Sequence, residues 1–72
     1  MWGADDYQIQ QLKNMIIWNW NQEGKKQAID TLASYRKKAL PALTEIASAM
    51  WWDNEIKIYT LDKIRQINES NI

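Results

Sequence analysis

Cysteine, histidine and phenylalanine are all absent from the 72 residues of this chain. Without cysteine there can be no disulfide, no thiol nucleophile and no thiolate metal ligand. Without histidine the chain lacks the commonest metal ligand and the usual proton carrier at neutral pH. The sequence also contains no phosphate-binding loop and no nucleophile–base pair. We therefore expect a protein that is not an enzyme and has no catalytic residue, cofactor or metal.

A charge excess of one sign and a long apolar run are missing as well. Nine basic and nine acidic residues give a formal net charge of zero, so no long-range field draws the chain toward nucleic acid or an anionic membrane. The longest apolar stretch is far shorter than the roughly 20 residues that span a bilayer. The first residues have neither the basic start nor the apolar core of a signal peptide. We expect a soluble, cytoplasmic protein without membrane contact.

Glycine and proline are scarce, with two glycines and one proline in the whole chain, which favours a helical protein. Apolar residues recur at three- and four-residue spacing, which predicts four amphipathic helices. The first begins at Asp5 or Asp6, the second covers about 22–35, the third begins near Pro41, and the fourth follows a cap at Asp53 or Asn54. The predicted buried stripes consist of Ile9, Leu12, Met15, Ile16, Trp20, Ala28, Ile29, Leu32, Ala33, Leu40, Leu43, Ile46, Ala47, Met50, Ile56, Leu61, Ile64 and Ile67.

The two halves of the chain repeat each other. A shift of 32 residues pairs Trp20 with Trp52, Glu23 with Glu55, Ile29 with Leu61, and Asp30 with Asp62. A shift of 31 residues pairs Leu12 with Leu43 and Met15 with Ile46 in the other two helices. A period of this length is typical of solenoids built from helical hairpins. We expect a single domain over 1–72, with repeat one at about 5–36 and repeat two at about 37–69.

At the segments ALPALTEIA (39–47) and DNEIKIYTLDKI (53–64), the chain resembles the HEAT-repeat family in its short bacterial and archaeal form. The resemblance implies an all-α fold of four helices that form two stacked antiparallel helical hairpins, an α-α superhelix. It also implies protein binding on the concave surface, which the second helix of each repeat lines. The chain departs from the family at Arg36, where a glycine with left-handed backbone is common, and at Thr60, where alanine is common.

Polar residues opposite the apolar stripes of the second and fourth helices form the first candidate binding surface. If the repeats stack, like residues lie on like, which predicts rows of glutamates and aspartates around Tyr59. Such an acidic groove suits a basic peptide or protein surface, whereas the simpler interpretation is a solvated polar face. The candidate partner-binding residues are Glu23, Gln27, Asp30, Glu55, Tyr59 and Asp62.

Tryptophans form the second candidate surface. Trp20 and Trp51 fall on the apolar stripes by helical extrapolation, and we predict that both are buried. Trp18 and Trp52 fall off the stripes at equivalent turns of the two repeats, where they form an aromatic patch along one edge. Exposed aromatic side chains are typical anchors of protein interfaces. In the other interpretation, the turns fold these rings back over the ends of the hairpins.

These features favour a small HEAT-like module that binds another protein. Two repeats are fewer than the three or so that normally make a stable stack, so we also expect a homodimer or membership in a longer array. The alternative function is a structural or assembly subunit whose only partner is itself. A nucleic-acid-binding module is less favoured, because nine acids balance the basic residues Lys25, Lys26, Arg36, Lys37 and Lys38.

Overall fold

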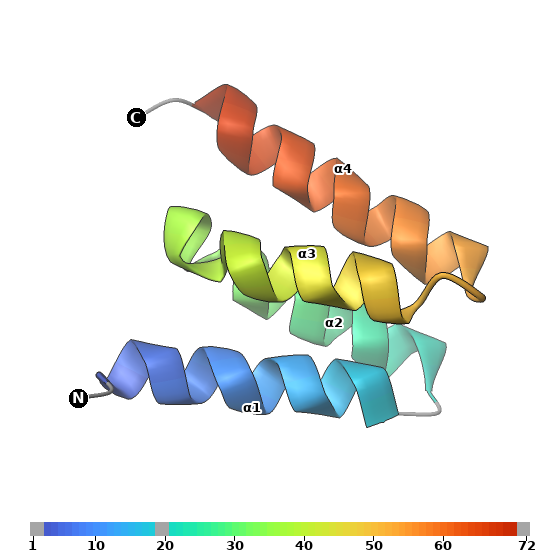
Figure 1. Cartoon of the computed structure of the whole chain (residues 1–72), viewed down its shortest axis with the longest axis horizontal. Coiled ribbons are helices and arrows are strands. Elements are labelled where there is room, and N and C mark those ends of the chain that lie inside the picture. The colour runs from blue at the N-terminus through green and yellow to red at the C-terminus, as the bar shows by residue number, and fades with distance from the viewer. Residues whose placement is uncertain (1–2, 19–20, 71–72) are drawn as a thin grey trace.

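The computed structural model describes residues 3–18 and 21–70, and every regular element in this part of the chain is helical. The elements are α1 (Ala4–Trp18), α2 (Gln22–Ala33), the 3-10 helix η1 (Arg36–Ala39), α3 (Leu40–Ala49) and α4 (Asn54–Ser70) (Figure 1). The prediction of an all-α chain with four helices is confirmed. Over these described ranges, no helix combines the length and the apolar character needed to cross a membrane.

The helices begin where local sequence signals place them. The Asn21 side chain accepts hydrogen bonds from the backbone N–H groups of Glu23 and Gly24, at 2.9 and 3.2 Å, and so caps α2. Asp53 does the same for α4 by accepting the N–H of Ile56 at 3.3 Å. Pro41 lies in the first turn of α3, where its missing N–H leaves no intrahelical bond unmade. The cap predicted at Asp53 or Asn54 is thus Asp53, and the predicted place of Pro41 is confirmed.

Arg36 has a left-handed backbone, with a φ of 60°. It opens η1, directly after the turn that ends α2. Residues with a Cβ atom pay a steric cost in this region, and glycine does not. At Arg36 the chain therefore adopts, with an arginine, a backbone conformation that favours glycine.

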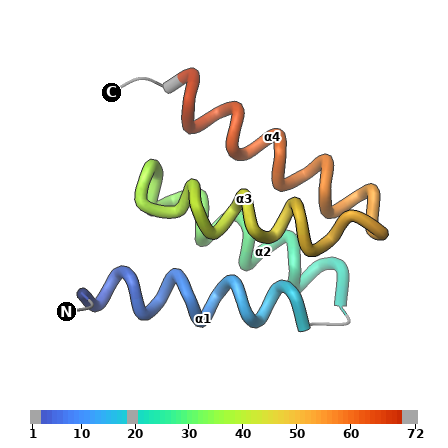
Figure 2. Tube along the Cα trace, in the orientation of Figure 1, coloured from blue at the N-terminus to red at the C-terminus, as the bar shows by residue number. Residues whose placement is uncertain are grey.

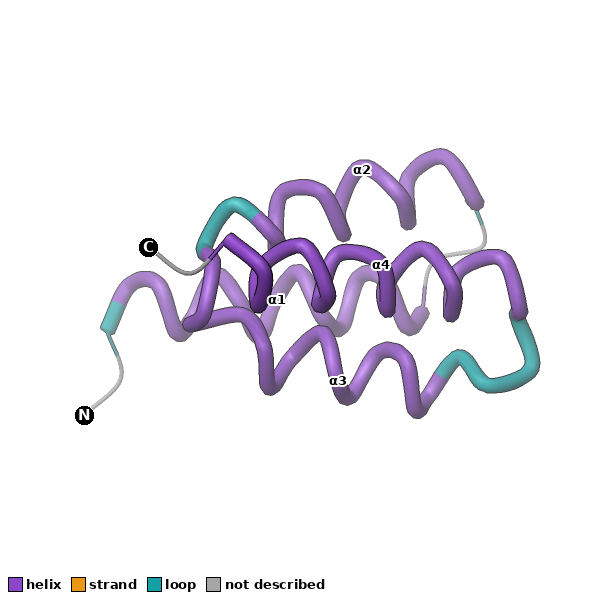
Figure 3. The backbone as a smooth tube through the Cα atoms, turned by 90° about the horizontal axis from the view of Figure 1, so that it is seen from above, coloured by secondary structure: helices purple, strands orange, loops and turns teal. Residues whose placement is uncertain are grey.

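The helices alternate in direction and stack around a central pair. α1 packs against α2 and α3, α4 packs against the same two helices, and α2 and α3 also contact each other. Figures 1 and 2 place α1 and α4 on opposite sides of this pair, and in the view from above in Figure 3 the two helices overlap between α2 and α3. An ion pair between Lys13 and Glu45, 2.9 Å long, links α1 to α3. The inner helices α2 and α3 thus have three helical neighbours, and the outer helices have two main ones.

The core lies where these four helices meet, and most of the predicted stripes reach it. The buried apolar residues are Ile9, Ile16, Ala28, Ile29, Leu32, Ala39, Ala42, Leu43, Ile46, Met50, Ile56 and Ile67. Leu12, Ala33, Leu40 and Ile64 are partly buried against them. The burial predicted for Trp20 concerns a residue outside the described part of the chain.

Three residues predicted to be buried are exposed. Met15 is 55% exposed because its neighbour Ile16 takes the inward position, and one residue turns a helix by about 100°. Leu61 is 47% exposed for the same reason, since Thr60 points inward and is fully buried. Trp51 is 73% exposed because α3 ends at Ala49, so helical extrapolation does not apply to the following turn.

The exposure of Leu61 also affects the predicted repeat. Its aligned partner Ile29 is fully buried. In a second aligned pair, Leu12 is partly buried and Leu43 is fully buried. These pairs therefore do not share one environment, as an ideal repeat would require. The helix caps Asn21 and Asp53 do occupy equivalent places, so the correspondence holds for helix starts and fails for part of the packing.

Candidate functional site: the α2–α4 face and the aromatic end

The N-terminal turns of α2 and α4 meet around a buried lysine. Lys25 is only 4% exposed, and its Nζ lies 3.7 Å from Asp53 Oδ2. The same Nζ lies 5.2 Å from the centre of the Trp52 ring, within the range of a cation–π interaction. A carboxylate and a ring face thus compensate an ammonium group that has left water. In the sequence, Lys25 is one of the basic residues that suggest a nucleic-acid surface, whereas in the structure it is buried and joins two helices.

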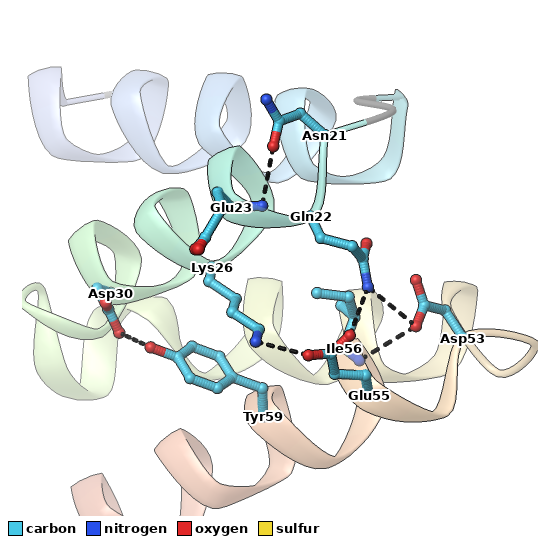
Figure 4. Close-up of polar contacts among 9 residues, drawn as sticks. All are labelled: Asn21, Gln22, Glu23, Lys26, Asp30, Asp53, Glu55, Ile56 and Tyr59. Carbon is cyan, nitrogen blue, oxygen red and sulfur yellow. Dashed lines mark hydrogen bonds and ion pairs between the residues drawn. The ribbon is translucent and has the colours of Figure 1, made fainter.

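Glu55 forms the next contact between α2 and α4. It accepts hydrogen bonds from Lys26 Nζ at 2.6 Å and from Gln22 Nε2 at 3.0 Å (Figure 4). The hydrogen bond from Lys26 holds the pKa of Glu55 below its usual value, with a further contribution from Gln22. The same bond raises the pKa of Lys26. Both groups therefore stay charged near neutral pH, and Glu55 is engaged within the molecule.

Tyr59 and Asp30 form the third contact. The Tyr59 hydroxyl donates to Asp30 Oδ1 at 2.7 Å (Figure 4). Lys63 Nζ lies 3.1 Å from the same oxygen. Lys26 and Lys63 lie 5.7 and 5.3 Å from the centre of the Tyr59 ring. The hydrogen bond to Asp30 raises the pKa of Tyr59 to about 12. Burial acts to raise the pKa of Asp30, but the bonds from Tyr59 and Lys63 outweigh it and leave that pKa lowered.

The predicted acidic rows are therefore replaced by contacts between unlike groups. Asp30 bonds to Tyr59 and Lys63 of α4 and does not form a row with Asp62. Asp62 instead bonds to Arg65 and Gln66 of its own helix. Glu23 and Gln27 are exposed on α2. Of the six groove candidates, the structure brings Asp30 and Tyr59 together directly, and Glu55 lies beside them across Lys26.

Among the described residues, three tryptophans are exposed at one end of the molecule, which we call the aromatic end (Trp18, Trp51 and Trp52). Trp18 is the last residue of α1, and the other two belong to the turn between α3 and α4. Figures 1 and 3 place the end of α1 and this turn at the same end of the bundle. Their exposed fractions are 77%, 73% and 60%. The predicted positions of Trp18 and Trp52 off the core are confirmed, whereas the burial predicted for Trp51 is wrong.

The outer helices carry further exposed apolar side chains that sequence reasoning did not select. Tyr7 and Met15 of α1 are 59% and 55% exposed, and a shallow depression lies at Gln11, Asn14 and Met15. On α4, Ile58 is 57% exposed, close in sequence to Leu61. The sequence does indicate an exposed face on α1, because four residues recur there at helical spacing: Tyr7, Gln11, Asn14 and Trp18.

Chemically, the described part of the chain offers binding surfaces and ion pairs. Its acidic residues form no cluster of three that could hold a metal ion. Thr60 Oγ1 is the one buried side-chain oxygen or nitrogen there without a hydrogen-bond partner, and it faces the core rather than a cleft. Compared with protein-family models, with curated proteins and with solved structures, the chain matches none in any of the three comparisons.

Proposed function

We propose that this chain is a small interaction module without catalytic activity that binds another protein through its aromatic end. The exposure of Trp18, Trp51 and Trp52 at one end of a compact bundle carries the proposal. Tryptophan has a large apolar surface, and leaving three of them in water forgoes stabilisation that burial would supply. In protein interfaces, tryptophan is among the residues that contribute most to binding. A partner that covers this end gains binding free energy from the burial of the three tryptophan rings.

The helix arrangement supports a HEAT-like form for the module. α1 and α3 pack side by side, as do α2 and α4, which is the contact pattern expected of two stacked antiparallel hairpins. Under this proposal the repeats cover about 5–36 and 37–69 of a single cytoplasmic domain. The equivalent caps Asn21 and Asp53 favour this division, and the unequal burial of Ile29 and Leu61 counts against an ideal repeat.

The α2–α4 face is the second candidate surface, and the contacts make it less favourable for a basic partner. Lys26 neutralises Glu55, while Lys63 and Tyr59 engage Asp30. A basic peptide would have to displace these lysines before it could reach the acids. Glu23 and Gln27 are exposed on α2, so they stay the best binding candidates of this face, whereas Arg65 and Gln66 engage both carboxylate oxygens of Asp62.

Two other functions compete with this proposal. A subunit that only self-associates is favoured by the exposed apolar residues Met15 and Leu61 on the outer helices. A nucleic-acid-binding module is less favoured, because Lys25 is buried and both Lys26 and Lys38 are paired with acids. Three of the five basic residues that suggested it are therefore engaged within the chain.

The test compares capture by the wild-type chain and by a Trp51→Ala/Trp52→Ala variant. A captured protein is identified, purified and titrated against both. We expect the double variant to bind it about tenfold or more weakly, as loss of an interface anchor does. Ser48→Ala is the control, since Ser48 is an exposed residue of α3 outside the aromatic end.

Three outcomes would contradict the aromatic end as the binding surface. Unchanged binding by the tryptophan variant refutes it directly. Loss of binding in a Glu23→Lys/Asp62→Lys variant alone assigns the partner to the α2–α4 face. Recovery of nothing except further copies of this chain supports the assembly subunit instead.

A further inference from the structure

The outer helices expose two apolar residues whose aligned counterparts in the inner helices are fully buried. Leu61 of α4 is 47% exposed, and its counterpart Ile29 in α2 is 0% exposed. Met15 of α1 is 55% exposed, and its counterpart Ile46 in α3 is 0% exposed. Every aligned pair compares an outer helix with an inner one, and not all pairs differ in this sense. Ile9 and Ile16 of α1 are buried, whereas their counterparts in α3 are partly buried.

The neighbours of each helix explain these mismatches. Inner helix α2 packs against α1, α3 and α4, whereas α4 has only α2 and α3 as main helical neighbours. Likewise, α3 packs against three helices and α1 against two. The third neighbour of α2 is α3, and among the described helices α4 has no neighbour in the corresponding place. In sequence order, the equivalent of α2 is α4, and the equivalent of α3 is a further copy of α1.

Two exposed faces would meet in such a contact. We define the front face as Tyr7, Gln11 and Met15 of α1, and the rear face as Ile58 and Leu61 of α4. The front face carries no charged group. Next to the rear face, Arg65 is already ion-paired with Asp62 of the same helix. Lys57, four residues before Leu61, also borders the rear face. A lysine side chain can keep its ammonium group in water at the edge of a contact, so joining the two faces buries apolar surface and does not require that a charge be buried.

We propose that a second copy of this chain stacks head-to-tail on the first, with the front face of one copy on the rear face of the other. α1 of the second copy then takes the place beside α4 that α3 takes beside α2 within one chain. The four helices alternate in direction within the chain (Figure 2), and in this arrangement the second copy's α1 runs opposite to α4. Because the formal net charge of the chain is zero, two copies do not repel each other through an overall charge.

The contact joins two different surfaces, so it leaves one front face and one rear face free in every assembly. Such a heterologous contact extends into longer stacks unless it closes into a ring. Contacts between two front faces or two rear faces would stop at a dimer. The two possibilities therefore differ in size and in their response to single substitutions.

The experiment uses Met15→Glu, which places a charge on the front face, and Leu61→Glu, which places one on the rear face. Sedimentation equilibrium of the wild-type chain should show species larger than a dimer as the concentration rises. Each variant alone should self-associate about tenfold or more weakly. An equimolar mixture should form a heterodimer of twice the 8.6 kDa chain mass, because each variant retains the face that the other lacks.

Ser48→Glu is the control, because Ser48 is an exposed residue of α3 that belongs to neither face. It should associate as the wild type does, and circular dichroism should show all variants to be helical. A wild-type chain that stays monomeric at millimolar concentration overturns the proposal. So does a dimer abolished by one substitution and unaffected by the other, which indicates a contact between like faces. Neither substitution alters Trp51 or Trp52, so failure here leaves the aromatic end to be judged by its own test.

Discussion

At the scale of single residues, Tyr59 illustrates how one side chain can couple two helices. Its ring lies beside two lysines, and its hydroxyl reaches Asp30 on α2. The ring thus contacts the ammonium groups of the two lysines, while the hydroxyl donates a hydrogen bond to the carboxylate of Asp30. Because Asp30 also binds Lys63, the four groups form a network whose strength depends on the charge of each member.

The Tyr59–Asp30 hydrogen bond predicts a pH-dependent effect of Tyr59→Phe on the free energy of unfolding. Tyr59 has a raised pKa in the folded state, about 12 against an ordinary 10.0, so its contribution is complete below pH 10 and is lost as pH rises toward 12. Asp30 has a lowered pKa, so its contribution is present above the unfolded-state pKa and is lost as pH falls through the folded-state pKa. Near pH 7 we expect Tyr59→Phe to cost about 1 kcal/mol, since the bond is partly exposed.

Urea unfolding of wild type and Tyr59→Phe at pH 7 and at pH 11.5 measures this difference. The two proteins should converge at the higher pH. Tyr7→Phe serves as the control and should have a smaller effect, because the Tyr7 hydroxyl accepts a bond from Gln11 of its own helix. If Asp30→Asn leaves the ionisation of Tyr59 unchanged in an absorbance titration, the hydrogen bond is not the cause of the raised pKa.

At the scale of elements, the connection between α2 and α3 is the least favourable piece of backbone in the described chain. Arg36 has a φ of 60°, which costs a non-glycine residue of order 1 kcal/mol. Arg36→Gly should relieve this cost, although glycine also increases the freedom of the unfolded chain. We expect a net gain of about 0.5 kcal/mol in the free energy of unfolding. Urea denaturation measures it.

Lys37→Gly is the control for this substitution. Lys37 follows Arg36 in η1 and is not among the described residues with positive φ. There, glycine should give no gain and should destabilise the chain by up to about 1 kcal/mol. If both glycine variants lower the stability equally, the left-handed backbone at Arg36 carries no cost.

The elements also show which features the sequence alone can predict. The caps Asn21 and Asp53 and the place of Pro41 follow from interactions within three or four residues, so local patterns suffice to find them. Exposure of Met15 depends on how α1 docks against its neighbours, which no local pattern contains. A shift of one residue in a stripe was enough to move a side chain from core to solvent.

The candidate site follows the same division. Exposure of Trp18 and Trp52 was predictable, since both lie off the apolar stripes. The contacts that neutralise Asp30 and Glu55 join residues about thirty positions apart, and they exist only because α2 and α4 lie side by side. Their partners Lys63 and Lys26 look like ordinary surface lysines in the sequence. For that reason an acidic groove was predicted where the structure has a mixed-charge contact.

At the scale of the whole molecule, the number of neighbours decides what a repeated residue contributes. The sequence aligns Ile29 with Leu61, but one lies in a helix with three helical neighbours and the other in a helix with two main ones. Ile29→Ala should therefore cost about 3 kcal/mol, as truncations in a packed core do. Leu61→Ala should cost less than about 1 kcal/mol. Chemical denaturation at low micromolar concentration measures both in the single chain.

The costs of Ile29→Ala and Leu61→Ala should respond differently to protein concentration. If a second copy covers the rear face, Leu61→Ala should become more costly as the wild type assembles, because mass action adds the free energy of association to the stability of the wild type. Ile29→Ala should keep its cost, since its environment is complete within one chain. Equal costs for the two variants at low concentration would mean that α4 buries Leu61 as α2 buries Ile29. In that case, the distinction between inner and outer helices would not govern the stability of this fold.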